Sequence, residues 1–161
     1  MVKKTSDVNE EVTPDELKWI ASITKLLDAK FKIPGTSITF GWDPIIGIIP
    51  GFGDIVSFGI SSLLVLSMIR HGASREVVIK MLLNLGLDTA TGTIPVLGGI
   101  FDVFYKANIR NYNLLKQHQV EGKHKGKGWG LIIGASIVIL LMFALLMFGM
   151  VKFVQFFIGL F

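Results

Sequence analysis

The stretch GWDPIIGIIPGFGDI at residues 41–55 and its partial copy GLDTATGTIPVLGGI at residues 86–100 decide how this chain folds. Proline removes a backbone donor, and glycine permits conformations and close approaches that other residues resist. The copies therefore predict two breaks at equivalent places in strongly apolar sequence, and paired breaks point to a site in membrane proteins. Seven of the fifteen aligned positions are identical: Gly41/Gly86, Asp43/Asp88, Gly47/Gly92, Ile49/Ile94, Pro50/Pro95, Gly53/Gly98 and Ile55/Ile100.

The C-terminal segment predicts a transmembrane helix over residues 129–161. Residues 129–151 carry no charge, and about 20 apolar residues suffice to cross the hydrocarbon core of a bilayer. Trp129 suits one membrane interface. At the other interface Lys152 can extend to the headgroups beside Phe153 and Phe156.

Composition supports a membrane protein and argues against an enzyme. The chain has 161 residues, of which 51% are hydrophobic and 17% charged, and its mean hydropathy of +0.60 is too high for an ordinary soluble domain. The absence of cysteine excludes disulfides, thiolate metal sites and cysteine nucleophiles. The three histidines show no catalytic pairing or metal-ligand spacing. We therefore expect no catalytic residue, no metal and no cofactor.

The N-terminal region divides into a disordered tail, residues 1–13, and an amphipathic helix, residues 14–32. Thr13 and Pro14 form a typical helix start. The apolar face of this helix, which includes Leu17, can lie on a membrane surface or pack on the rest of the domain. Both alternatives stay open.

The middle of the chain predicts a two-repeat membrane domain over residues 33–118, with repeats at about 41–70 and 86–117. Each repeat reads as a helix, an IPxxG bend and a second helix, and Asp54 is expected to cap the helix that ends at Arg70. The predicted fold is an all-α membrane protein with two tandem helix–IPxxG bend–helix repeats plus a C-terminal transmembrane helix.

Basic residues suggest the topology. The segment 119–128 forms a basic linker. We expect the protein in the plasma or inner membrane, and the positive-inside tendency places this linker on the cytoplasmic side and the C-terminus on the outer side. Re-entrant hairpins are favoured over three separate crossings or a tethered soluble-like helical domain, because they keep the flanking basic residues on one side. Bends at membrane depth must meet each other or further copies, so we expect a homo-oligomer. The hairpin-flanking basic residues are Lys32, Arg70, Arg75, Lys106 and Arg110.

Three stretches carry a resemblance to a known family: KFKIPGT at residues 30–36, FGWDPIIGIIPGFGD at 40–54, and DTATGTIPVLGGIFDVFYKANIRNYNLL at 88–115. In order and spacing they resemble a membrane-domain family, number 4112 in the domain-of-unknown-function series, over about residues 16–118. Gly99 departs from the pattern, since the family often has an acid there. The resemblance implies a membrane-associated domain and supplies no activity.

Asp43 and Asp88, the acids repeated in both copies, are the centre of the first candidate site, to which Asp54 and Asp102 are added. Ionisable groups inside a membrane are costly and usually functional. These acids can converge near the bends and bind a cation, a proton or a small solute, or they can cap helices at headgroup depth. The bends can bind an anion at helix N-termini or serve close packing alone. The candidate ion or solute site comprises Asp43, Asp88, Asp54 and Asp102, and the helix breaks comprise Pro50, Gly51, Gly53, Pro95 and Gly98.

Four lysines form a second candidate site, which can bind anionic lipid headgroups or only fix the topology. IPGFG also resembles a DNA-binding helix-hairpin-helix motif, but no basic residue lies between Lys32 and Arg70, so we expect no nucleic acid partner. The hypotheses that remain are an oligomeric channel or carrier, a membrane-shaping scaffold, and a lipid-binding module on the bilayer. The four lysines are Lys116, Lys123, Lys125 and Lys127.

Overall fold

The computed structural model describes residues 15–47, 51–92, 97–120 and 129–159, and this part of the chain is mostly helical. The disordered tail predicted for residues 1–13 lies outside it. The elements are α1 (Asp15–Ala29), β1 (Phe31–Lys32), β2 (Thr39–Phe40), α2 (Asp43–Ile46), α3 (Phe52–Arg70), α4 (Arg75–Gly92), α5 (Leu97–Tyr105), α6 (Ala107–Val120) and α7 (Trp129–Ile158).

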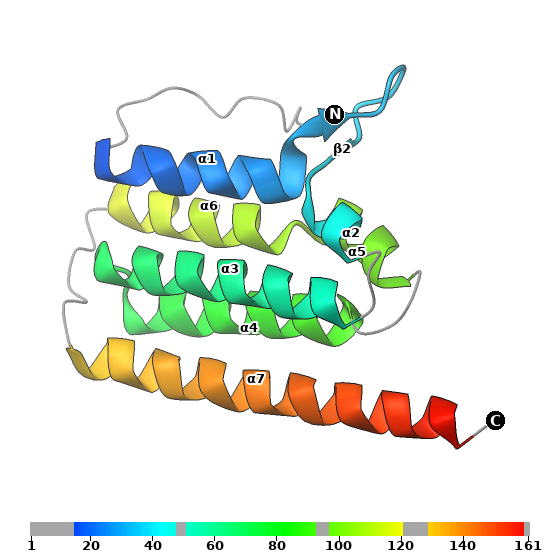
Figure 1. Cartoon of the computed structure of the whole chain (residues 1–161). Helices are drawn as coiled ribbons and strands as arrows, with labels where there is room; N and C mark the ends of the chain where they lie inside the picture. The colour runs from blue at the N-terminus through cyan, green and yellow to red at the C-terminus, as the bar shows by residue number, and fades with distance from the viewer. Residues whose placement is uncertain (1–14, 48–50, 93–96, 121–128, 160–161) are drawn as a thin grey trace.

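The long helices run side by side in layers (Figure 1). Helix α1 packs on α6, α6 packs on α4, and α3 and α4 form an antiparallel pair against which α7 lies. The short helices α2 and α5 pack on each other at one end of the bundle, beside the antiparallel β1–β2 hairpin. The chain therefore brings the sequences on either side of both predicted breaks to the same end.

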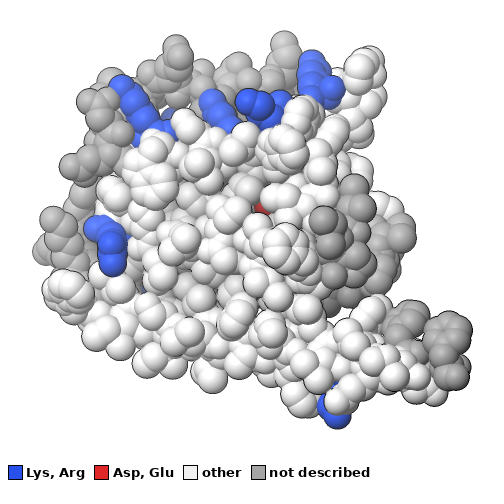
Figure 2. Space-filling model, viewed as in Figure 1, with Lys and Arg blue, Asp and Glu red and all other residues white. Residues whose placement is uncertain are grey.

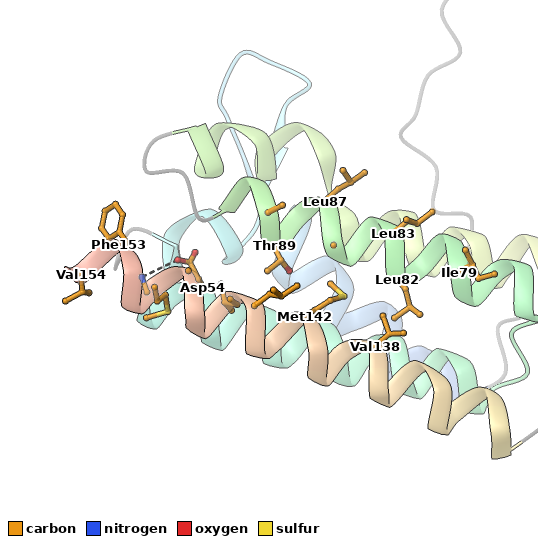
Figure 3. A pocket seen from close by; sticks show the side chains of 17 residues that line it. Asp54, Ile79, Leu82, Leu83, Leu87, Thr89, Val138, Met142, Phe153 and Val154 are labelled. Atoms are coloured by element: carbon orange, nitrogen blue, oxygen red, sulfur yellow. Dashed lines mark hydrogen bonds between the residues drawn. The ribbon is translucent and has the colours of Figure 1, made fainter. Parts of the chain in front are cut away.

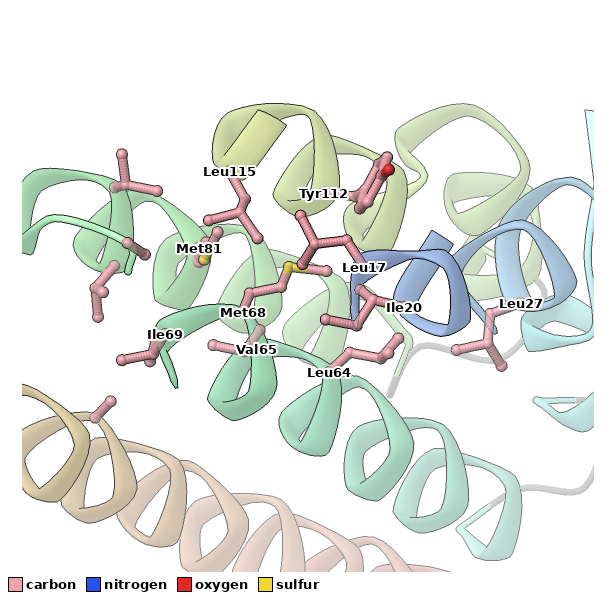
Figure 4. Packing of buried hydrophobic residues seen from close by; sticks show 14 residues of the cluster. Leu17, Ile20, Leu27, Leu64, Val65, Met68, Ile69, Met81, Tyr112 and Leu115 are labelled. Atoms are coloured by element: carbon pink, nitrogen blue, oxygen red, sulfur yellow. The ribbon is translucent and has the colours of Figure 1, made fainter. Parts of the chain in front are cut away.

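The main core lies between α1, α3, α4 and α6 (Figure 4). Full burial of each large apolar side chain contributes about 1.5–3 kcal/mol, so this core holds the four helices together. The apolar face predicted for α1 is the face that packs here. Its fully buried members include Leu17 and Ile20 from α1, Val65 and Met68 from α3, Met81 from α4, and Leu115 from α6.

Two helices, α3 and α7, are long and apolar enough to cross a membrane by length and composition. Helix α7 touches the bundle through Ala135, Ile139 and Leu146, which are buried, while most of its other side chains are exposed. At 1.5 Å per residue its 30 residues extend about 45 Å. An isolated exposed apolar surface of this size is unstable in water.

Charge is distributed unevenly over the molecule. In Figure 2 many Lys and Arg side chains gather along the edge formed by α1. The basic residue of α7 is Lys152, near the C-terminal end of the helix. Lys18 and Lys25 of α1 are both exposed. One edge of the bundle thus suits a polar environment and the opposite edge an apolar one.

The structure differs from the predicted elements at two places. The first helix ends at Ala29 instead of Lys32, because Phe31 and Lys32 pair with β2. The single helix predicted up to Gln117 is split into α5 and α6 at Lys106, whose φ of 51° is left-handed.

The two repeats also have unequal arms, since α2 has four residues and α3 has 19. The ends of α3 lie at opposite ends of the bundle (Figure 1), so Arg70 is far from the β1–β2 hairpin that holds Lys32. The long antiparallel hairpin is α3–α4, which lies between the two breaks.

Candidate functional site

The four predicted acids come from four helices and line one small cavity. Asp43 begins α2, Asp54 lies in the first turn of α3, Asp88 lies near the end of α4, and Asp102 lies in α5. The cavity has a volume of about 30 Å³, which is enough for about one water molecule. The structure therefore brings together side chains that are up to 59 positions apart in the sequence.

A buried hydrogen-bond network stands behind this cavity. The Asn108 Nδ2 donates to Asp28 Oδ1 at 2.9 Å and to Asp43 Oδ2 at 3.1 Å. The Ile109 amide donates to Asp28 Oδ2 at 2.8 Å, and the Ser57 hydroxyl donates to Asp43 Oδ1 at 3.0 Å. The network joins α1, α2, α3 and α6, so it fixes the position of Asp43 at the cavity wall.

Sequence reasoning missed Asp28 and Asn108 as parts of this site. Both are buried, with 4% and 1% of their surface exposed. A signal was present, because Asp28 lies four residues after Thr24 on the buried face of α1, and Asn108 lies seven residues before the buried Leu115. A polar residue in the apolar stripe of a helix is expected to have a specific partner.

Burial changes the charge of these carboxyls. It raises the pKa of Asp43 to about 7, with the neighbouring Asp28 charge adding to the effect. Burial also raises the pKa of Asp28, and it raises the pKa of Asp102 to about 7, with the charges of Asp28 and Asp54 adding to it. The Lys106 charge acts in the opposite direction on Asp28. Burial therefore favours the protonated forms of these carboxyls below about pH 7.

The carboxyls are not arranged as a metal-coordination sphere. Within the described residues no three Asp, Glu or His side chains come close enough together to hold a metal ion. A cluster of this kind suits protons or a cation that is held by charge without a fixed ligand geometry.

The first break positions Asp54 in a way that differs from the prediction. Helix α3 begins at Phe52, with Gly51 as its N-cap at a φ of 82°, so Asp54 is the third residue of the helix and is not its cap. The Asp54 Oδ2 accepts the Gly51 amide at 3.2 Å. Its carboxylate still lies in the first turn, where the helix dipole favours a negative charge.

Glycine at position 53 allows α2 to pack on α3. A Cβ at Gly53 would lie 2.0 Å from the carbonyl oxygen of Ile46. Gly98 is the second residue of α5. Pro50 and Pro95 lie outside the described residues. Gly53 thus has a packing reason that the sequence pattern alone does not reveal.

The predicted headgroup site is described at one position only. Lys116 is half-buried in α6, at the end of the bundle opposite the acids. Lys123, Lys125 and Lys127 lie outside the described residues.

Comparison with known proteins yields one match. Residues 16–119 match the model of a protein family described as a domain of unknown function, DUF4112. This confirms the resemblance found in the sequence, and the C-terminal helix α7 lies outside the matched range. No curated protein and no solved structure matches the chain.

Proposed function

From the premise that this chain belongs to the DUF4112 family, we propose that it is a small integral membrane protein that exchanges protons for a monovalent cation at its acidic cavity. The observation that carries the proposal is the convergence of four carboxyls on one cavity at the end of the bundle: Asp43, Asp54, Asp88 and Asp102.

Charge balance gives the exchange its physical basis. The cavity and the network behind it hold five carboxyls, and full ionisation of all of them in a buried site is costly. Protons reduce this cost at neutral pH. A cation that enters the cavity stabilises the ionised forms, so its binding displaces protons.

The two apolar helices supply the membrane orientation in this proposal. With α3 and α7 crossing the bilayer, the cavity lies at the first turn of α3, close to one membrane surface. The exposed Lys25 of α1 then needs a polar environment, since lipid chains do not solvate its charge. We therefore propose a homo-oligomer in which α1 faces other copies or a water-filled path.

The test uses the full chain in liposomes that contain a trapped pH indicator. A gradient of sodium ions is imposed, because this small monovalent cation suits a cavity the size of about one water molecule and cannot carry a proton itself. We expect proton movement at least tenfold faster than in protein-free liposomes. The double variant Asp43→Asn/Asp88→Asn should reduce the rate at least tenfold.

The control is Glu76→Gln, which changes an exposed acid paired with Lys80 at the opposite end of the bundle. This variant should retain the wild-type rate. Equal proton movement in the wild type and the double variant would refute the proposed exchange at the cavity.

A further inference from the structure

A large groove runs between α4 and α7 (Figure 3). Its volume is about 1060 Å³, at the upper end of the range for ligand pockets. The walls are almost entirely apolar, and their lining residues include Leu82 and Leu87 from α4 and Met142 and Leu146 from α7. Such a groove fits an apolar ligand.

The shape of the groove fits a single long chain. Its lining residues on α7 extend from Val138 to Val154, which is about 24 Å along the helix. This is more than half of the roughly 30 Å hydrocarbon core of a bilayer, so the groove can accommodate a chain as long as those in one leaflet. In the proposed orientation it also runs along the bilayer normal, as lipid chains do.

One end of the groove is polar. Asp54 lies there beside Phe153 and Val154 (Figure 3), and it lines both the groove and the acidic cavity, as Thr89 does. Its Oδ2 accepts the Gly51 amide, and none of the described residues donates to its Oδ1. A carboxylate oxygen is therefore available where the groove meets the cavity.

The charge around this end selects the head of the ligand. Asp43, Asp88 and Asp102 lie beyond Asp54 around the cavity, so phosphate and carboxylate heads are repelled and a cation is attracted. Lys152 directly precedes Phe153 on the same turn of α7, but it does not line the groove. Its Nζ points to the Gln155 oxygen at 3.4 Å and to the Phe148 ring.

We propose that the groove binds the apolar chain of an amphiphilic ammonium compound whose cationic head lies at Asp54. This inference rests on the proposed function, because a cationic head at Asp54, where the groove meets the cavity, would displace protons from the same group of carboxyls.

A glycine keeps the groove open. Gly86 of α4 lines it, and a Cβ at this position would meet only the Met142 Cε, at 3.5 Å. A leucine at position 86 would therefore enter the space assigned to the ligand chain. Gly59 of α3 offers a matched control, because its Cβ would meet nothing within 4 Å and it does not line the groove.

The test measures binding to the full chain in nanodiscs, with empty nanodiscs as background. Four probes separate head from chain: decyltrimethylammonium, tetramethylammonium, decanol and decanoate. We expect decyltrimethylammonium to bind at least 100-fold more tightly than tetramethylammonium and at least tenfold more tightly than decanol or decanoate. Gly86→Leu should weaken decyltrimethylammonium binding at least tenfold, while Gly59→Leu should leave it unchanged.

A second variant tests the head independently of the chain. Asp54→Asn keeps an oxygen that can accept the Gly51 amide, so the helix start is retained. It should weaken decyltrimethylammonium binding at least tenfold and change decanol binding less than twofold. Equal loss for both probes would overturn the assignment of the cationic head to Asp54.

The outcomes distinguish this inference from the proposed function. Equal affinities for decyltrimethylammonium and tetramethylammonium, with proton exchange intact, would overturn the groove assignment and leave the exchange standing. Tight decyltrimethylammonium binding that depends on Gly86 and Asp54 but releases no proton would support the groove and overturn the exchange. Retention of a bilayer phospholipid that decyltrimethylammonium cannot displace would overturn the ligand class.

Discussion

Replacement of Gly53 by alanine is expected to separate two helices at the candidate site. The added Cβ would lie 2.0 Å from the Ile46 carbonyl oxygen and 2.9 Å from the Gly47 Cα. Both are backbone atoms, so side-chain rotation cannot relieve the clash and α2 must move away from α3. Because the clash is with backbone atoms, it costs about 2–3 kcal/mol, at the upper end of the range for overpacking, and the better helix propensity of alanine returns about 1 kcal/mol.

The net loss of about 1–2 kcal/mol can be measured by thermal unfolding of the full chain in a mild detergent, with tryptophan fluorescence as the signal. For a chain of this size 1 kcal/mol corresponds to about 2–4 °C, so the Tm of Gly53→Ala should fall by about 2–8 °C. The matched variant Gly59→Ala lies in the same helix with open space around its Cβ. It should be neutral or stabilising by up to about 1 kcal/mol. A Tm of Gly53→Ala at or above the wild-type value would refute the close approach of α2 to α3.

Two further predictions concern the buried network. Asn108→Ala removes the donor shared by two buried carboxyls and should lower the free energy of unfolding by about 2–4 kcal/mol in denaturant titrations. Asn113→Ala, on the exposed side of α6, should change it by less than about 0.5 kcal/mol. Because burial raises the pKa of Asp43 from 3.8 to about 7, the fold favours its protonated form. The stabilisation is therefore complete below about pH 4 and falls as the pH rises to about 7, by up to about 4 kcal/mol. Asp28 and Asp102, whose charges face Asp43, add to the fall, and an equally steep fall in Asp43→Asn would contradict the assignment.

The sequence predicted those parts of the fold that depend on local chemistry. The proline and glycine runs correctly predicted that the chain breaks between α2 and α3 and between α4 and α5. The uncharged C-terminal stretch correctly predicted the helix α7. The break at Lys106 could not be predicted, because lysine has no intrinsic preference for a left-handed conformation. Its Nζ donates to Thr39 Oγ1, 67 positions away, so tertiary contacts accompany that conformation.

The same distinction between local chemistry and long-range contacts applies to the candidate site. The repeat pattern singled out Asp43 and Asp88, and Asp54 and Asp102 were added as further acids near the bends, but the sequence could not show that the four share one cavity. Asp28 and Asn108 were missed because the Asn108 amide bonds to partners 80 and 65 positions away. Pairings over such distances leave no trace in a single sequence, apart from a polar residue in an apolar helix stripe.

The order of the helices has a consequence for engineering by module exchange. Along the chain α2, α3, α4 and α5 are short, long, long and short, so the first copy of the repeat precedes a long helix and the second follows one. Pro44 is harmless in the first turn of α2, but its aligned position in the second copy is Thr89, inside α4. Transplanting residues 41–55 onto 86–100 would put proline in a helix interior, at a cost of about 3 kcal/mol. The two copies therefore cannot be exchanged, because aligned positions in them lie at different places in their helices.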